Sequence, residues 1–212
     1  HCGTRISPRY PMIELLTAVA FLAVTLTLGP TPMMLAGIVF TGLLIAMAGI
    51  DIDTQYLPDS LTLTLLWLGL LLSVPGVVPS FFASLLHFEF RIVDESVLPV
   101  TPADSIVGAA LGYGVLWAVY WAFKLLTGKE GMGYGDFKLL GALGAWMGWQ
   151  VLLPIILISA LAGSVLGVVM IVTGMTKRAQ PLPFGPYLAL AGWVMFLWGR
   201  AVIDMFKNIF LA

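Results

Sequence analysis

The sequence has little charge and almost no cysteine. Only 10% of its 212 residues are charged and 60% are apolar, whereas a soluble domain is about one quarter charged and about half apolar. This composition excludes an ordinary soluble domain and favours an integral membrane protein. The single cysteine, Cys2, excludes an internal disulfide framework, and the net charge of −1 gives no reason to expect a nucleic-acid partner. The two histidines, His1 and His87, have no partner at metal-ligand spacing, so we predict no metal site.

Long apolar runs dominate the chain. A membrane-spanning helix needs about 20 apolar residues at roughly 1.5 Å each. Six stretches meet this requirement: Tyr10–Leu28, Met33–Ile50, Leu61–Val78, Ser105–Leu126, Val151–Thr173 and Tyr187–Met205. A seventh, Phe137–Trp149, is short and glycine-rich, and is open to interpretation as a thin span, a tilted helix or a re-entrant segment. Pro75 and Pro154 lie within two of the stretches, where proline can kink a helix. We predict an all-α polytopic bundle of about six to seven transmembrane helices.

Lysine and arginine are unevenly divided between the two sides of this bundle. If residue 1 is cytoplasmic and all seven segments cross, the cytoplasmic side holds Arg5, Arg9, Lys124, Lys129, Lys138, Lys177 and Arg178, and the far side holds Arg91, Arg200 and Lys207. Cytoplasmic loops carry the excess of basic residues, so we expect a cytoplasmic N-terminus and a C-terminus on the far side. Asp51 and Asp136 then lie at the same, cytoplasmic face.

These two aspartates stand at the ends of apolar runs, where an ionisable group is costly and therefore a candidate for a functional site. Two carboxylates that can meet repel one another, so one tends to be neutral while the other is ionised. One aspartate can then activate a water molecule while the other protonates a departing amide. This pattern indicates peptide hydrolysis at the membrane surface.

The first aspartate opens the stretch Asp51-Ile-Asp53-Thr-Gln-Tyr-Leu-Pro58-Asp59. Its three carboxylates can also be interpreted as a solvated loop between two spans. Asp59 or Ser60 can alternatively be the N-cap of the following helix, and the sequence leaves that interpretation open.

The second aspartate ends a stretch with four glycines, Gly128-Lys-Glu-Gly131-Met-Gly133-Tyr-Gly135-Asp136, and Lys138 follows. Glycine lets chains approach closely, but the stretch can also be a flexible loop with Asp136 as the N-cap of the next helix. It is not a phosphate-binding loop, because it lacks the G-K-[S/T] ending. A third stretch, residues 180–187, contains Pro183-Phe-Gly185-Pro186 and is either a rigid turn at a helix start or a wall that lines a peptide groove.

Taken together, these stretches resemble the type IV prepilin peptidases, membrane aspartyl proteases with a G-x-G-D motif. The resemblance covers nearly the whole chain and rests on residues 9–16, Asp51 to Thr62, Gly128 to Leu140, and Pro183 to Pro186. It implies that Asp51 and Asp136 are the catalytic pair. It also implies substrate-binding or site-supporting roles for Asp53, Asp59, Gly133, Gly135, Lys138, Pro183 and Gly185.

The resemblance further implies a multi-pass protein of the bacterial inner membrane. Such enzymes cleave the basic leader peptide from type IV prepilins or type II secretion pseudopilins at the cytoplasmic face, without a cofactor for this step. The negative field of Asp51, Asp53 and Asp59 would suit a basic leader. A transporter or channel that uses intramembrane carboxylates is the alternative, and a structural subunit of a pilus or secretion assembly is a third hypothesis.

Full-length members of this family often also methylate the new N-terminus with S-adenosylmethionine. That activity is associated with a cytosolic region whose two C-x-x-C pairs could bind zinc. The start of this chain, His1-Cys2-Gly3, resembles the tail of the second pair, so Cys2 would be a remnant zinc ligand. We therefore interpret residues 1–9 as a remnant of the cytosolic region and residues 10–212 as the transmembrane aspartyl peptidase domain. S-adenosylmethionine, zinc and methyltransferase activity are expected only for a full-length protein.

Overall fold

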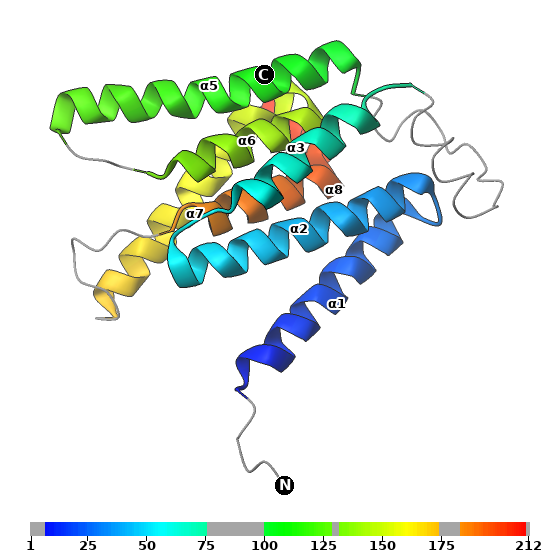
Figure 1. The fold of residues 1–212 in the computed structure, drawn as a ribbon, viewed down its shortest axis with the longest axis horizontal. Helices are drawn as coiled ribbons and strands as arrows, with labels where there is room; N and C mark the ends of the chain where they lie inside the picture. The colour runs from blue at the N-terminus through cyan, green and yellow to red at the C-terminus, as the bar shows by residue number, and fades with distance from the viewer. Residues whose placement is uncertain (1–6, 76–99, 129–131, 174–182, 211–212) are drawn as a thin grey trace, which may run out of the picture.

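The computed structural model describes residues 7–75, 100–128, 132–173 and 183–210, and every regular element in these ranges is helical. The helices are α1 (Arg9–Leu28), α2 (Pro32–Thr54), α3 (Asp59–Leu72), α5 (Pro102–Thr127), α6 (Tyr134–Met147), the short 3₁₀ helix η1 (Trp149–Val151), α7 (Leu152–Val172) and α8 (Gly185–Phe210) (Figure 1). Five of the described spans are long and apolar enough to cross a membrane, η1 and α7 together forming one of them. The predicted all-α polytopic membrane fold is confirmed.

Proline or a distorted backbone shapes three of the helices. α3 has 14 residues and ends at Leu72, before Pro75, so the described part of this helix is shorter than the predicted span. Proline cannot donate a helical hydrogen bond and clashes with the preceding turn, which explains the early end. Pro154 lies in the first turn of α7, where its missing N–H breaks no helical bond. In α8 the backbone leaves helical geometry at Trp198 (φ −126°, ψ 19°), a position without proline.

Successive helices run in opposite directions between two ends of the bundle, and side-chain contacts fix which helix ends lie together. The start of α1 lies at the end of α2, because Arg9 pairs with Asp53. The end of α5 lies at the start of α6, because the rings of Tyr120 and Tyr134 are 5.4 Å apart. The end of α6 returns to the start of α5, where a Cβ on Gly148 would be 3.6 Å from the Cβ of Asp104. The stretch Phe137–Trp149 therefore passes from one end of the bundle to the other.

Helix α6 is the buried centre of the bundle. Every residue from Asp136 to Met147 except Lys138 is buried, and α6 packs most closely along α5 through facing small residues. A Cβ on Gly144 would lie 2.1 Å from the carbonyl oxygen of Gly108, so the two backbones touch. The hydroxyl of Ser105 donates to the carbonyl oxygen of Ala145 at 2.6 Å. Small residues with a cross-helix hydrogen bond are the usual means of close helix packing in membranes.

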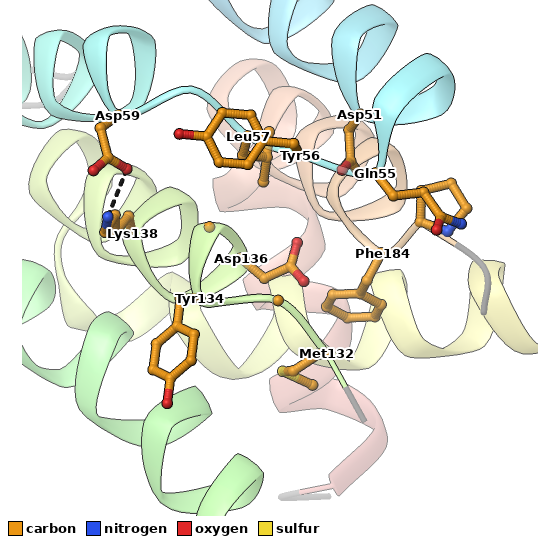
Figure 2. A pocket seen from close by; sticks show the side chains of 13 residues that line it. Asp51, Gln55, Tyr56, Leu57, Asp59, Met132, Tyr134, Asp136, Lys138 and Phe184 are labelled. Atoms are coloured by element: carbon orange, nitrogen blue, oxygen red, sulfur yellow. Dashed lines mark hydrogen bonds and ion pairs between the residues drawn. The ribbon is translucent and has the colours of Figure 1, made fainter. Parts of the chain in front are cut away.

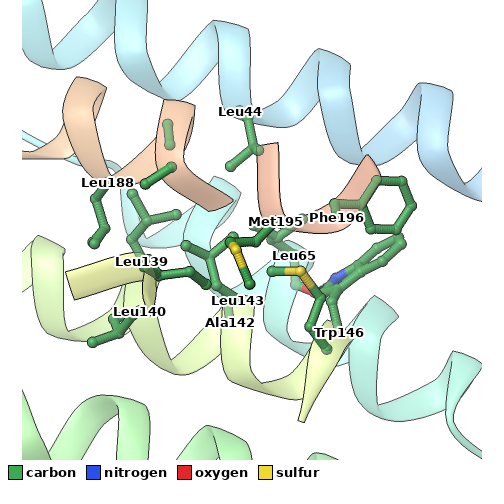
Figure 3. Packing of buried hydrophobic residues seen from close by; sticks show 14 of the residues in the cluster. Leu44, Leu65, Leu139, Leu140, Ala142, Leu143, Trp146, Leu188, Met195 and Phe196 are labelled. Carbon is green, nitrogen blue, oxygen red and sulfur yellow. Dashed lines mark hydrogen bonds between the residues drawn. The ribbon is translucent and has the colours of Figure 1, made fainter. Parts of the chain in front are cut away.

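An aromatic cluster anchors the far end of α6 (Figure 3). Trp146 donates its indole N–H to the carbonyl oxygen of Leu65 on α3 at 2.7 Å. Its ring lies 4.7 Å from that of Phe40 on α2, which lies 4.6 Å from Phe196 on α8. Four helices therefore share one packed core, and the position of α6 is set at the end remote from Asp136.

Candidate active site

A pocket of about 440 Å³ opens at the end of the bundle where α2 ends and α6 and α8 begin (Figure 2). Its lining includes residues from all three motifs singled out in the sequence: Asp51, Asp59, Gly133, Gly135, Asp136, Lys138 and Pro183. These motifs are far apart along the chain, so the fold brings together most of the predicted site residues.

Asp51 lies in the last turn of α2 and is 5% exposed. Its Oδ2 atom has no hydrogen-bond partner among the described residues. The nearest backbone is that of Gly185, the first residue of α8, where a Cβ would lie 2.5 Å from this oxygen. A buried carboxyl oxygen without a partner is costly, which indicates a group held for chemistry and not for stability.

Asp136 lies in the first turn of α6 and is also 5% exposed. The N-cap of α6 is Gly133, so the interpretation of Asp136 as the cap is wrong. Asp136 precedes the apolar part of α6 and lies outside the five candidate spans. Burial, followed by the negative charge of Asp51, raises the pKa of Asp136 to about 7, and a hydrogen bond with the backbone of Gly133 opposes the rise. Figure 2 shows both carboxyl groups pointing into the same space.

Leu57 explains why glycine is needed on two sides of the pocket. This residue of the α2–α3 connection is 4% exposed. A Cβ on Gly135 would lie 2.6 Å from the Leu57 Cβ, and a Cβ on Gly185 would lie 3.2 Å from its Cδ1. At Gly133 the nearest atoms are 3.9 Å away, an ordinary contact. Leu57 thus packs the α2–α3 connection against both α6 and α8. The close approach of these backbones to Leu57 requires glycine at positions 135 and 185 but not at 133.

The other two acids of the first motif are paired with bases. Lys138 Nζ lies 2.5 Å from Asp59 Oδ1, and both residues line the pocket. Arg9 lies 2.6 Å from Asp53 Oδ2, but Asp53 does not line the pocket. The prediction that three carboxylates create a negative field is therefore corrected. Arg9 neutralises Asp53 and Lys138 neutralises Asp59. Asp53 braces the α1–α2 contact, at a distance from the pocket wall.

The N-cap of α3 is Pro58, and no side chain caps this helix. The interpretation of Asp59 or Ser60 as its N-cap is therefore wrong. Asp59 is instead the first residue of α3 and points to Lys138 (Figure 2).

The start of α8 forms one wall of the pocket. Pro183 and Phe184 line it, and the carbonyl oxygen of Phe184 accepts hydrogen bonds from the N–H groups of Tyr187 and Leu188. Gly185 and Pro186 are not among the lining residues of this pocket, and a role of the stretch in binding a peptide stays a prediction.

Sequence reasoning missed several pocket residues: Gln55, Tyr56, Leu57, Met132, Tyr134 and Phe184. Leu57 could have been found, because it is a large apolar residue fixed between polar ones and a proline. Cys2 and Gly131 lie outside the described residues. Within the described ranges no group of three His, Cys, Asp or Glu side chains could hold a metal ion.

The geometry suits general acid–base chemistry on a bound water molecule. One buried carboxyl group has a pKa near neutrality, and a second faces the same pocket. Such a pair can carry one proton in total and pass it to or from a water molecule or another group in the pocket.

Comparison with known proteins places this site in a family. Residues 38–168 match the model of the type IV leader peptidase family. The prepilin leader peptidase/N-methyltransferase of Aeromonas hydrophila is 48% identical over 210 residues, which cover 99% of this chain and 65% of that protein. The proteins of the same name from Xanthomonas campestris and Pseudomonas aeruginosa are 47% and 48% identical and are covered to 64% and 62% of their lengths.

This chain spans about two thirds or slightly less of the length of these relatives. No solved structure matched it. The family model covers more than half of the chain, including Asp51, Asp136 and the pocket residues between them. The chain belongs to the type IV leader peptidase family.

Proposed function

We propose that this chain is a membrane aspartic peptidase that removes the basic leader from type IV prepilins or type II secretion pseudopilins. The observation that carries the proposal is the pair of buried carboxyl groups, Asp51 and Asp136, which face one pocket. Membership of a leader peptidase family supports the choice of substrate. The remaining pocket residues would bind the substrate or support the site.

In the proposed reaction Asp136 begins protonated and Asp51 ionised, in line with the raised pKa of Asp136. Asp51 accepts a proton from a water molecule held between the two groups while that water attacks the scissile carbonyl carbon. Asp136 gives its proton to the carbonyl oxygen, and a tetrahedral diol forms without a covalent enzyme intermediate. Asp51 then returns its proton to the amide nitrogen, the C–N bond breaks, and Asp136 recovers a proton from the diol hydroxyl.

We place the pocket and the N-terminus at the cytoplasmic face of the bacterial inner membrane, and the C-terminus on the far side. The alternation of helices between two ends supports this topology, because the start of α1 and the two aspartates share one end. Among the described bases, Arg9, Lys124 and Lys138 lie at that end, in line with the basic residues expected on the cytoplasmic side. The relatives are named prepilin leader peptidase/N-methyltransferases, so methylation of the new N-terminus with S-adenosylmethionine is a second activity to test.

Cleavage of a prepilin-like substrate in detergent or lipid tests the proposal. The wild-type chain is compared with Asp51→Asn and Asp136→Asn, and with Asp53→Asn as a matched acid that does not line the pocket. We expect cleavage to fall by about a thousandfold or more in the first two variants and to persist in the third. Product mass in the presence of S-adenosylmethionine reports methylation.

Cleavage that survives both pocket substitutions would overturn the proposed pair. The alternative of a proton or cation transporter is less well supported, because both acids lie at one end of the bundle and not at its middle. Ion flux in vesicles that the wild-type chain supports and that Asp51→Asn and Asp136→Asn abolish would favour that alternative.

A further inference from the structure

One ion pair stands inside the pocket beside the two aspartates. Lys138, two residues after Asp136, reaches across to Asp59 at the start of α3 (Figure 2). The side chain of Asp59 is 53% exposed and that of Lys138 is 30% exposed. The carboxylate is therefore accessible from the pocket mouth while its internal partner is more deeply placed.

Asp59 differs from the other aspartates of the described part of this end in both exposure and position. Asp51 and Asp136 are buried and are assigned to the chemistry. Asp53 lies outside the pocket and pairs with Arg9. Among the described residues that line the pocket, Asp59 is the remaining acid, and its partly exposed carboxylate is accessible to a cationic segment of a substrate.

We propose that Asp59 is a binding subsite for a basic residue of the leader, occupied at rest by Lys138, which the substrate displaces. This inference rests on the proposed function. A partly exposed ion pair contributes little net stability, so one ammonium or guanidinium group can replace another at small cost. Lysine suits the resting role, because its flexible stem lets the ammonium group move away without disturbing the helix.

The competing explanation is that Lys138 and Asp59 only clamp α3 to α6. Other contacts already fasten these helices, because Leu57 wedges against Gly135 and Trp146 donates a hydrogen bond to Leu65. The ion pair is therefore not needed for that contact. A clamp also predicts no preference among peptides of different charge.

Binding of a fluorescent leader peptide to the full chain in lipid nanodiscs tests the exchange, with Asp136→Asn present in every protein to prevent turnover. Two peptides are compared, one with its natural basic residues and one with these changed to glutamine. Lys138→Gln should tighten binding of the basic peptide about threefold, the size expected when an exposed ion pair no longer has to be broken. It should leave the neutral peptide unchanged. The gain should shrink as salt is added, because mobile ions screen exposed charges.

Two further variants complete the test. Asp59→Asn should weaken binding of the basic peptide to the level of the neutral one. Arg9→Gln is the matched control, since it frees Asp53 from a similar ion pair outside the pocket, and it should change neither affinity.

The charge-swapped double variant Asp59→Lys with Lys138→Asp separates subsite from clamp. This variant can retain an ion pair between α3 and α6, but with its polarity reversed. If Asp59 is a binding subsite, the preference for the basic peptide should be lost. If the ion pair only clamps the two helices, both peptides should bind as they do to wild type. Unchanged or weaker binding of the basic peptide by Lys138→Gln, or an equal effect on both peptides, would overturn the inference. If cleavage by the otherwise wild-type enzyme still depends on Asp51 and Asp136, the proposed function stands despite that result.

Discussion

Gly185 and Asp51 are in contact although they are far apart in the sequence: the first residue of α8 lies against the carboxyl group at the last turn of α2. This contact sets the distance between two pocket walls. It leaves no room for a side chain at position 185.

Gly185→Ala should therefore displace Asp51 or push α8 outward. The added methyl group would lie 2.5 Å from Oδ2 of Asp51, and overpacking of this kind costs about 1–3 kcal/mol. We expect leader cleavage to fall at least tenfold. Gly133→Ala is the control, because its Cβ meets ordinary contacts at 3.9 Å, and it should retain cleavage within about twofold of wild type. Equal loss in both variants would show that the whole glycine stretch, and not this contact, is sensitive.

The pH dependence of stability should report the proton on Asp136. Its pKa is about 7 in the folded chain against an ordinary value of 3.8, so the folded state binds more protons than the unfolded state between these values. Stability from this group is fully present below about pH 3.8 and is lost as pH rises through about 7. The melting temperature of wild type relative to Asp136→Asn should fall across that window and then level off. A constant difference would mean that folding does not raise the pKa of Asp136.

Leader cleavage should also fall as pH rises through about 7, because the proposed mechanism starts with protonated Asp136. A rate that rises through this range would instead require Asp136 to act first as the base. The measurement is a pH–rate profile with the substrate well below saturation, so that ionisations of the free enzyme are observed.

Gly144→Ala should separate α5 from α6. The new Cβ would meet the carbonyl oxygen of Gly108 at 2.1 Å, and backbone cannot yield as a flexible side chain can. We expect a loss of at least about 3 kcal/mol in stability, seen as a large drop in melting temperature. Gly114→Ala on α5 is the control, since nothing lies within 4 Å of its Cβ position, and it should be neutral or slightly stabilising. Similar stability of both variants would contradict close backbone packing.

Trp146→Phe should destabilise the far end of α6 by about 1–3 kcal/mol, because it removes a buried hydrogen bond to Leu65 and part of an aromatic contact. Trp67→Phe serves for comparison, since Trp67 is 62% exposed and should change stability little. The melting temperatures of the two variants, measured by thermal unfolding in the same detergent, test this prediction. Cleavage by Trp146→Phe should persist at temperatures where the protein stays folded, because Trp146 is remote from the pocket.

Apolar runs and the three motifs were enough to predict the helical fold and to bring Asp51 and Asp136 together. Hydropathy reports the length of a run but not its neighbours, so the stretch Phe137–Trp149 could not be placed from sequence. Its passage through the bundle depends on the small residues of α5 that face it, such as Gly108.

The charge pairs could not be predicted for a related reason. Lys138 and Asp59 are 79 residues apart, and Arg9 and Asp53 are 44 apart, so their pairing depends on which helices lie side by side. The role of Leu57 was missed because its importance comes from two glycines in other motifs. The ion pairs and the role of Leu57 depend on how helices pack side by side, and the hydrophobic periodicity of a single helix does not indicate its neighbours.

The closure of the pocket by α8 has a consequence for biosynthesis. Asp51 is made before Asp136, but the backbone that confines Asp51 belongs to α8, which is made after both aspartates. A nascent chain released before Gly185 would carry both aspartates and lack the wall that holds one of them. Under the proposed function, the chain would therefore become able to cleave a peptide only after α8 has been made, which would keep a chain that lacks α8 from cutting its neighbours in the membrane.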